Sequence, residues 1–313
     1  MTNQILVTGA NGFIGSGLVP ELIAHGYAVR RCTRNPGEGS DMAVGEIEPD
    51  TDWNQALMGI STVVHLAGRA HVLKDISNDP LTEFRRINVE GTLTLARNSA
   101  QAGVRRFIYI SSIGVNGIQS ARPFTESETP QPVEPYAISK YEAEQGLLQI
   151  SRSSEMEVVI IRPPLVYGPN APGNFGRLLR VVHRGFPLPL GAIHNKRSLV
   201  ALENLVDLIV TTIAHPAAAN QIFLAGDGED LSTTELLQRM ARALGRPLRL
   251  ISVPVWLIEA GAYLIGKEVL AQKLCGSLQV DISKARNVLG WMPPVSFDEA
   301  MQKTANYFLE SQQ

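Results

Sequence analysis

The sequence predicts an α/β fold, with a doubly wound parallel sheet followed by a smaller mixed α/β lobe. Short apolar runs alternate with amphipathic stretches through the first half of the chain. Continuous apolar runs are typical of parallel strands that are covered on both faces. The first run leads directly into a glycine-rich turn, and Pro and Gly become frequent after Pro163. The change in composition after Pro163 indicates the start of a second lobe with a different arrangement of strands and helices.

The order of these runs predicts a single open sheet. Right-handed crossovers through the intervening helices then give the doubly wound arrangement. The expected strands are Ile5–Thr8, Ala28–Cys32, Thr62–Ala67, Arg106–Ser111, Val158–Arg162 and Gln221–Ala225. The expected helices cover residues 13–25, 81–102, 136–152, 203–214, 233–243 and 297–310.

Composition excludes several classes of protein. The chain has 313 residues, 44% of them hydrophobic, and a formal net charge of −2. The charge balance argues against a nucleic-acid-binding protein, which usually carries a basic excess. The two cysteines form no CxxC pair or metal-ligand cluster, so we expect free thiols and no metal site.

The chain carries no pattern of a targeting or membrane-spanning segment. The amino-terminal residues lack the basic and apolar regions of a signal peptide, so the cytoplasm is the expected location. The longest apolar stretch of the second half, Val253–Gly266, is interrupted by Glu259 and is shorter than the ~20 residues of a membrane span. We therefore expect a packed helix there and no membrane span.

The glycine-rich turn predicts a dinucleotide site. Gly9 permits a tight turn, Gly12 lets the backbone approach a pyrophosphate, and Gly15 lets the following helix pack closely on the strand. The helix N-terminus supplies free N–H groups to the anion. The spacing is GxxGxxG, which differs from the more familiar GxGxxG. We expect a dinucleotide-binding domain at 1–169, to which 198–225 returns, and a substrate lobe at 170–313.

The segment after the second strand indicates which nicotinamide cofactor is used. NAD-binding folds usually place an acid there to hold the adenosine ribose, but no acid occurs between Ala28 and Pro36. Arg34 and Thr33 instead suit a 2′-phosphate. We expect NADP(H), with NAD(H) as the alternative if these strand-end arginines are only solvated.

Three residues predict the chemistry. Tyr136 and Lys140 are four residues apart on a predicted helix, so they share one face. A nearby ammonium favours the phenolate, and we therefore expect Lys140 to lower the pKa of Tyr136. The pair then moves a proton at an alcohol oxygen while a hydride moves at carbon. Ser112, at the end of a strand, would orient that oxygen, and Ser111 is the alternative or would face the nicotinamide.

With these elements together, the chain resembles the extended short-chain dehydrogenase/reductases, and among them the nucleotide-sugar epimerases and reductases. The resemblance covers nearly the whole chain, and the ordered set of motifs is specific although no single motif is. The motifs are TGANGFIG at 8–15, VVHLAG at 63–68, NVEGT at 88–92, YISS at 109–112, YAISK at 136–140, RPPLVYGP at 162–169, RSLVALENLVD at 197–207 and LGWMPP at 289–294.

The resemblance implies a fuller set of site residues. Ala67 and Gly68 would line the cofactor, Glu46 would meet the adenine amine, Asn88 would support the active-site backbone, and Pro163 would close over the nicotinamide. The residues expected to bind the cofactor are Gly9, Asn11, Gly12, Phe13, Ile14, Gly15, Thr33, Arg34, Glu46, Ile47, Leu66, Ala67, Gly68, Asn88, Ser111, Tyr136, Lys140 and Pro163.

The resemblance also implies where a UDP-sugar binds. Arg197 would hold the substrate diphosphate and Asn174 would contact the same group, while Arg69 and His71 would lie near the substrate mouth with Ser112. Each position has a structural alternative. Arg197 could form a surface ion pair, Asn174 could cap a helix, and His71 could be a surface histidine.

Departures from the family pattern refine the prediction. The 4,6-dehydratases carry Asp–Glu after the active-site Ser or Thr, but Ile113 and Gly114 follow Ser112, which argues against dehydration. Asn116 replaces an aromatic residue near the sugar. HLAGRAH, at 65–71, and KLCGSLQVD, at 273–281, are similar to the reductases of UDP-4-keto-6-deoxy-N-acetylhexosamines.

Three hypotheses follow. The first is a C4 ketoreductase that makes, for example, UDP-N-acetylquinovosamine for surface polysaccharide synthesis. The second is a UDP-hexose 4-epimerase acting on UDP-glucose or UDP-N-acetylglucosamine, whose cycle contains the same reduction step. The third is a non-catalytic NADP-binding redox sensor, which the retained Ser112, Tyr136 and Lys140 argue against. The family pattern further suggests a homodimer formed through the helices at 81–102 and 136–152.

Overall fold

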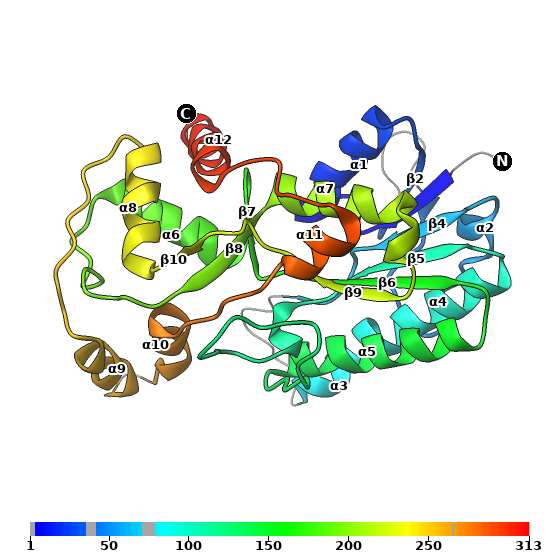
Figure 1. Ribbon diagram of the computed structural model, residues 1–313, viewed down its shortest axis with the longest axis horizontal. Coiled ribbons are helices and arrows are strands. Elements are labelled where there is room, and N and C mark those ends of the chain that lie inside the picture. Colours follow the sequence, from blue (N-terminus) through cyan, green and yellow to red (C-terminus); the bar gives the residue numbers. More distant parts are fainter. Residues whose placement is uncertain (1–3, 36–41, 71–78, 265, 313) are drawn as a thin grey trace.

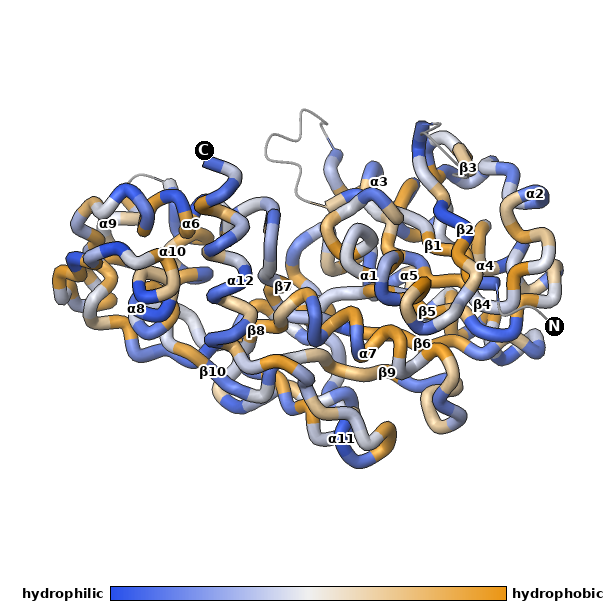
Figure 2. Tube along the Cα trace, turned by 90° about the horizontal axis from the view of Figure 1, so that it is seen from above, coloured by the Kyte–Doolittle hydropathy of each residue, from blue (hydrophilic) through white to orange (hydrophobic). Residues whose placement is uncertain are grey.

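The protein has two lobes that lie side by side along its longest axis (Figure 1). The computed structural model describes residues 4–35, 42–70, 79–264 and 266–312. The larger lobe contains the central sheet, and the smaller lobe carries the helices at 173–184, 233–243, 255–264, 268–275 and 297–310 (Figure 1). Seen from above, the two lobes remain distinct, with the smaller one at the left (Figure 2).

The larger lobe is built on a parallel sheet of seven strands, in the order β3-β2-β1-β4-β5-β6-β9. The strands are β1 Gln4–Thr8, β2 Ala28–Thr33, β3 Met42–Ala43, β4 Thr62–His65, β5 Arg106–Ile110, β6 Glu157–Arg162 and β9 Gln221–Leu224. The strand order reverses between β1 and β4, which is where ligands bind in open α/β sheets. The predicted doubly wound α/β fold is confirmed.

Helices cover both faces of this sheet because its central strands, such as β4 and β5, are buried on both sides. On one face, alternate residues such as Val7 and Ile108 pack against α1 (Phe13–Ala24), α7 (Leu202–Ala214) and α11 (Ser283–Leu289). On the other face, residues such as Leu6 and Phe107 pack against α4 and α5. The helices of this second face are α2 Asn54–Leu57, α3 Pro80–Arg85, α4 Thr92–Gln101 and α5 Pro135–Arg152.

The expected helix at 81–102 is interrupted rather than continuous. A π-helical turn, Arg86–Gly91, joins α3 to α4. π-Helical turns occur often at functional sites. The turn contains Asn88, whose side chain is buried, so the irregular turn places this amide inside the lobe.

The smaller lobe is mixed α/β, as predicted. Its sheet has the order β10-β8-β7, in which β7 and β8 are parallel and β8 and β10 antiparallel. A second core lies between this sheet and the helices α6, α8 and α12. The elements are β7 Leu165–Tyr167, β8 Arg197–Ala201, β10 Asp230–Leu231, α6 Gly173–Arg184, α8 Thr233–Ala243, α9 Val255–Leu264, α10 Glu268–Cys275 and α12 Phe297–Glu310.

Chain order and lobe membership do not coincide after residue 170. β9 returns to the large sheet beside β6, and α7 packs on that sheet, whereas β8 belongs to the small sheet. The sequence analysis expected residues 198–225 to return to the dinucleotide-binding domain, in a division of the chain into 1–169 and 170–313. The division itself stays a prediction.

The apolar stretch Val253–Gly266 departs from expectation. It forms a helix, α9, but none of its described residues is buried. Val255 and Ile258 are partly buried against the core of the smaller lobe, so the helix is packed on that side, whereas its other apolar residues are exposed. Within the described residues, no helix has the length and apolar character needed to cross a membrane.

Candidate active site

The glycine-rich turn forms the strand–turn–helix geometry of an anion site. Gly9 has a φ of +67°, and Gly12 N–H donates to the Gly9 carbonyl at 2.9 Å. A Cβ on Gly15 would lie 2.3 Å from the Gly9 oxygen, so only glycine lets α1 start this close to β1. No side chain caps the N-terminus of α1. Its amides are therefore available to a pyrophosphate.

The end of β4 lies directly against this turn. Leu66 N–H donates to the Thr8 carbonyl at 3.3 Å, and a Cβ on Gly9 would meet the Ala67 nitrogen at 2.9 Å. A Cβ on Gly68 would stand 3.0 Å from Asn88 Oδ1 and 3.5 Å from Lys140 Nζ. The close approach leaves a cradle without side chains between the turn and Lys140, which fits a dinucleotide.

Two of the residues expected at the adenosine end, Arg34 and Glu46, form an ion pair. Arg34 Nε lies 3.0 Å from Glu46 Oε1, and both side chains are largely exposed. The Thr33 hydroxyl donates to the Asn35 carbonyl at 2.7 Å. Ile47 packs within 2.9 Å of the position of a Cβ on Gly91. Arg34 is therefore placed at the end of β2, although an acid already pairs with it.

Lys140 is buried below the end of β5. Its Nζ donates to the Ile110 carbonyl at 2.9 Å and lies 4.5 Å from the centroid of the Tyr109 ring. Burial lowers the pKa of Lys140 to about 8, and the Glu144 carboxylate opposes that shift. The ammonium is thus held by a carbonyl and a ring, and the charge of Glu144, which is paired with Arg162, favours it as well.

Tyr136 lies beside Lys140, as the spacing predicted. Lys140 Nζ is 5.8 Å from the centroid of its ring, and Phe84 packs edge-on at 5.9 Å. Burial raises the pKa of Tyr136 to about 12. The expectation that Lys140 lowers this pKa was therefore wrong in direction, because desolvation of the phenolate outweighs an ammonium at this distance. The protonated phenol is a proton donor at neutral pH.

The segment after β5 brings Ser112 to the first turn of α5. The Ser112 hydroxyl accepts a hydrogen bond from Gly114 N–H at 3.1 Å. A Cβ on Gly114 would touch both Ser112 Oγ and Ala137 Cβ, at 3.4 and 3.3 Å. Ser112 therefore lies close to the residue after Tyr136. The buried Ser111 hydroxyl has no hydrogen-bond partner among the described residues, so it is available to a ligand.

Two further expected residues fix the backbone around this centre. Asn88 Oδ1 accepts from Arg69 N–H at 2.8 Å, and Asn88 Nδ2 donates to the Arg69 carbonyl and to Ser139 Oγ. Pro163 follows β6, and its carbonyl accepts from Ile113 N–H at 2.9 Å. These contacts tie the ends of β4, β5 and β6 to α5.

The expected substrate residues are spread over both lobes. Arg69 stacks on Phe84, with its guanidinium carbon 5.7 Å from the ring centroid. Arg197, at the start of β8, donates from Nη1 to the Gly276 carbonyl at 3.1 Å, and burial lowers its pKa. Asn174 is exposed in the first turn of α6, where Pro172 is the cap. His71 lies outside the described residues.

Sequence reasoning missed a buried ion pair behind the centre. Arg162 donates from Nε and Nη2 to the Glu144 carboxylate, at 2.9 and 2.5 Å, and from Nη1 to Asn116 Oδ1 at 2.9 Å. Glu144 follows Lys140 by one helical turn, so this spacing could have indicated a carboxylate on the same buried helix face. Asn116 is buried and also donates a hydrogen bond to the Thr125 carbonyl. The asparagine that replaces the family's aromatic residue is therefore part of the buried hydrogen-bond network.

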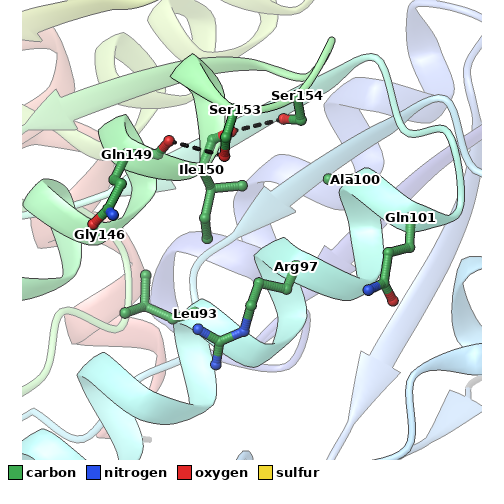
Figure 3. Close-up of a pocket in the computed structure, with 9 residues that line it drawn as sticks. All are labelled: Leu93, Arg97, Ala100, Gln101, Gly146, Gln149, Ile150, Ser153 and Ser154. Atoms are coloured by element: carbon green, nitrogen blue, oxygen red, sulfur yellow. Dashed lines mark hydrogen bonds between the residues drawn. The ribbon is translucent and has the colours of Figure 1, made fainter.

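Two hollows lie near these elements. One borders the anion site and the start of α6, and its lining includes Asn11, Phe13 and Arg180. The other lies on the outer surface of α4 and α5, where Leu93 and Ile150 face each other across it (Figure 3). No catalytic candidate lines the second hollow. Among the described residues, no three metal-ligating side chains come together.

Comparison with known proteins decides the family. The model of the NAD dependent epimerase/dehydratase family matches residues 5–226. The chain belongs to this family. It is also 45% identical to the UDP-glucose 4-epimerase of Vibrio cholerae, over 99% of this chain and 97% of that protein. The resemblance to the nucleotide-sugar group of extended short-chain dehydrogenase/reductases is thus confirmed.

Other members of the family share the full length of the chain. The N-acetyl-alpha-D-glucosaminyl-diphospho-ditrans,octacis-undecaprenol 4-epimerase of Escherichia coli O157:H7 is 26% identical, with 98% and 96% of the two chains covered. The structure of MoeE5 in complex with UDP-glucose and NAD is 28% identical, with a TM-score of 0.80 and coverage of 99% and 100%. As a member of this family, the protein is therefore an enzyme that uses a nicotinamide nucleotide.

Proposed function

We propose that this member of the epimerase/dehydratase family is a UDP-hexose 4-epimerase acting at C4 of a UDP-sugar such as UDP-glucose or UDP-N-acetylglucosamine. The observation that carries the proposal is the 45% identity to the Vibrio cholerae UDP-glucose 4-epimerase over nearly the whole chain. The grouping of Ser112, Tyr136 and Lys140 at the ends of β5 and α5 supports it.

Each residue has a distinct part in this reaction. The glycine turn and Lys140 would hold the dinucleotide, which would supply reversible hydride transfer at sugar C4. Tyr136 exchanges the proton of the sugar O4: as the phenolate, which the charge of Lys140 favours, it takes the proton, and as the phenol it returns it. Ser112 orients that oxygen by a hydrogen bond, and Lys140 holds positive charge beside the phenol. Arg197 would bind the diphosphate from the smaller lobe.

A C4 ketoreductase acting on a UDP-4-keto-6-deoxy-N-acetylhexosamine is the second candidate. Two observations favour it. No acid follows β2, where Arg34 stands, which suits NADPH. The pKa of Tyr136 is raised to about 12, so the phenol is ready to protonate a ketone oxygen. In this role the product, for example UDP-N-acetylquinovosamine, would serve surface polysaccharide synthesis.

We further propose a homodimer and a cytoplasmic location. The helices α4 and α5 pack closely, because a Cβ on Gly146 would stand 2.5 Å from Leu93. Their outer surface has a hollow that a partner copy would fill (Figure 3). Light scattering on the purified protein tests the dimer by measuring its molar mass. A mass of two chains would support the dimer, and a mass of one chain would contradict it.

One labelling experiment separates the two activities. UDP-glucose or UDP-N-acetylglucosamine with deuterium at C4 is incubated with the protein and NAD⁺, and the products are analysed by NMR. An epimerase returns the same deuterium to C4 of the other epimer with no net change in the cofactor. A reductase instead consumes NADPH with a 4-keto UDP-sugar and transfers the label from deuterated cofactor.

Tyr136→Phe is the control for both assays. It removes the proton donor and keeps the ring, so we expect turnover to be lost and the fold kept. Turnover like that of the unsubstituted protein would contradict the assignment of Tyr136. Failure to act on any C4 substrate in either assay would contradict the proposed function as a whole.

A further inference from the structure

The end of β2 carries a cation on the side of the sheet where the adenosine half of a dinucleotide is expected. β2 lies beside β1, with Cys32 opposite Thr8, so the residues after Cys32 stand level with the glycine turn. β4 lies on the other side of β1. In folds of this kind the pyrophosphate sits at the turn, and the adenosine ribose lies by the end of the second strand. Arg34, two residues beyond Cys32, therefore belongs to the ribose side of the site.

A second loop brings Glu46 to the same place. β3 pairs with β2, and Val44 N–H donates to the Thr33 carbonyl at 3.0 Å, so the chain after β3 runs alongside the end of β2. Arg34 Nε lies 3.0 Å from Glu46 Oε1. Among the described residues, no hydrogen bond reaches the other oxygen of this carboxylate. The carboxylate therefore pairs with the cation and still has acceptor capacity for a ligand.

The turn that carries Glu46 is fixed by contacts of its own. The Thr51 hydroxyl donates to the Glu46 carbonyl at 2.8 Å and accepts from Glu48 N–H at 2.9 Å. Ile47 packs against the π-helical turn, where a Cβ on Gly91 would stand 2.9 Å from the Ile47 side chain. The carboxylate of Glu46 is thus presented from a backbone that is held on both sides.

The ion pair changes which nucleotide suits the adenosine end. A 2′-phosphate bound by Arg34 would have to lie beside the Glu46 carboxylate, and like charges placed together in a binding site are strongly unfavourable. Ribose hydroxyls, in contrast, donate hydrogen bonds to a carboxylate. Thr33 offers a phosphate no donor, because its hydroxyl already donates to the Asn35 carbonyl at 2.7 Å. The arrangement therefore favours a free ribose over a phosphorylated one.

We propose that Glu46 is the acid that β2 itself lacks, and that its pairing with Arg34 makes this site select NAD(H) over NADP(H). The carboxylate accepts the ribose hydroxyls and neutralises the guanidinium that would otherwise attract a 2′-phosphate. In this role Glu46 acts on the ribose rather than on the adenine amine. This reverses what Arg34 alone would favour. The importance of NAD⁺ for an epimerase cycle rests on the proposed function, whereas the selection of the nucleotide does not.

A surface ion pair without a role in binding is the alternative. The side chains are 68% exposed for Arg34 and 49% for Glu46, and such pairs add little to the stability of a fold. The pair does not have to stabilise the fold in order to select a ligand, because a bound nucleotide covers it and lessens the screening by water. Only a selecting pair makes the nucleotide preference depend on the Glu46 carboxylate.

Calorimetric titration without a sugar measures this preference directly. We expect the unsubstituted protein to bind NAD⁺ about tenfold or more tightly than NADP⁺. Glu46→Gln keeps the shape of the side chain and removes its charge, so NADP⁺ should bind about tenfold more tightly and NAD⁺ a few-fold less tightly. The gain for NADP⁺ should shrink at high salt. Tighter binding of NADP⁺ by the unsubstituted protein, or binding of neither nucleotide, would overturn the proposal.

Two further variants show whether the effect passes through Arg34. Arg34→Gln combined with Glu46→Gln should lose the gain for NADP⁺, because the cation that binds the phosphate is gone. Asp50→Asn is the matched control, since Asp50 is exposed in the same turn and its replacement removes the same charge. A gain that persists in the double variant, or an equal gain in Asp50→Asn, would refute the selecting pair. Because no sugar is present, these outcomes are distinct from failure of the C4 assays, which contradicts the proposed function alone.

Discussion

The proposed chemistry depends on the positive charge of Lys140, and opposing effects act on the pKa of this residue. Burial disfavours the ammonium and brings the pKa to about 8, while Glu144 acts in the opposite direction. The Tyr109 ring, 4.5 Å away, also favours the ammonium through its π face. At neutral pH the ammonium form predominates, but small changes around it alter the pH at which it is lost.

Removing the ring below Lys140 tests this balance. Tyr109→Leu should lower the pKa of Lys140, because a desolvated cation–π contact is worth about 2 kcal/mol. We expect the alkaline limb of kcat/KM to move about 1.5 pH units lower. Tyr109→Phe keeps the ring and is the matched control. An unchanged pH profile in Tyr109→Leu would show that the ring does not stabilise the ammonium.

His65 predicts how the fold responds to acid. Burial, with a smaller effect of the Lys140 charge, lowers the pKa of His65 to about 3. Its two ring nitrogens lie 2.7 and 2.9 Å from the hydroxyls of Thr8 and Thr92. The unfolded chain binds the proton at about 6.5, so the free energy of unfolding should fall as pH drops from about 6.5 toward 3.

Denaturant titrations across this pH range measure the effect. The fall due to His65 is on the order of a few kcal/mol, and His65→Gln should make the slope against pH shallower. His194→Gln is the control, since His194 is exposed and makes no hydrogen bond to a described residue. An equally steep slope in both variants would exclude His65 as its source.

Single residues also show where sequence reasoning ends. Tyr136 and Lys140 were predicted together because their spacing alone puts them on one helix face. The pKa of Tyr136 was not, since desolvation depends on packing by Phe84 and other distant segments. The pairing of Arg34 with Glu46 was likewise hidden, because the contact joins two separate loops.

Among the elements, the join of β1 and α1 is the least tolerant of added volume. Gly15→Ala would place a methyl group 2.3 Å from the Gly9 oxygen and 2.6 Å from that of Ala10. Backbone atoms cannot yield cheaply, so we expect a loss of about 1–3 kcal/mol and greatly weakened dinucleotide binding. Thermal unfolding with and without NAD⁺ measures both.

A second helical glycine provides the comparison. Gly261, on α9, has open space around the position of its Cβ. Gly261→Ala should leave dinucleotide binding unchanged and stabilise the helix by up to about 1 kcal/mol. Equal tolerance of alanine at both positions would contradict the close-approach argument for Gly15.

The contact between α5 and β6 depends on a fully buried ion pair. Glu144→Gln leaves the Arg162 guanidinium buried without a counter-charge, which should cost about 3–5 kcal/mol in chemical denaturation. Adding Arg162→Met should recover part of that loss. Glu142→Gln, on the same helix, breaks only the exposed pair with Arg85 and should have little effect. Similar losses for both glutamates would refute the special role of burial.

Elements were predictable where their signal is local. The main strands are continuous apolar runs, and their predicted bounds agree closely with β1, β4, β5 and β6. β3 and β10 have two residues each, too few for any periodicity to show. α9 was predicted as a helix, but its exposure was not, because an apolar pattern alone does not show which side of a helix is covered.

At the scale of the whole molecule, the two lobes divide the work of binding. The glycine turn, Lys140 and the serines belong to the larger lobe, whereas Arg197 starts a strand of the smaller sheet. The sequence predicted a two-lobed chain from the change in texture after Pro163. It did not show how near Arg197 lies to α10, since that contact joins segments about 80 residues apart.

This division predicts that the two ligands can be weakened separately. Arg197→Ala should raise KM for a UDP-sugar on the order of tenfold to a hundredfold, because a charge-assisted hydrogen bond is worth about 1.5–3 kcal/mol. The dissociation constant of the dinucleotide, measured by fluorescence of the reduced cofactor, should not change. Lys196→Ala is the control, because the neighbouring Lys196 is exposed. If Arg197→Ala weakened both ligands equally, the smaller lobe would not be a separate substrate-binding unit.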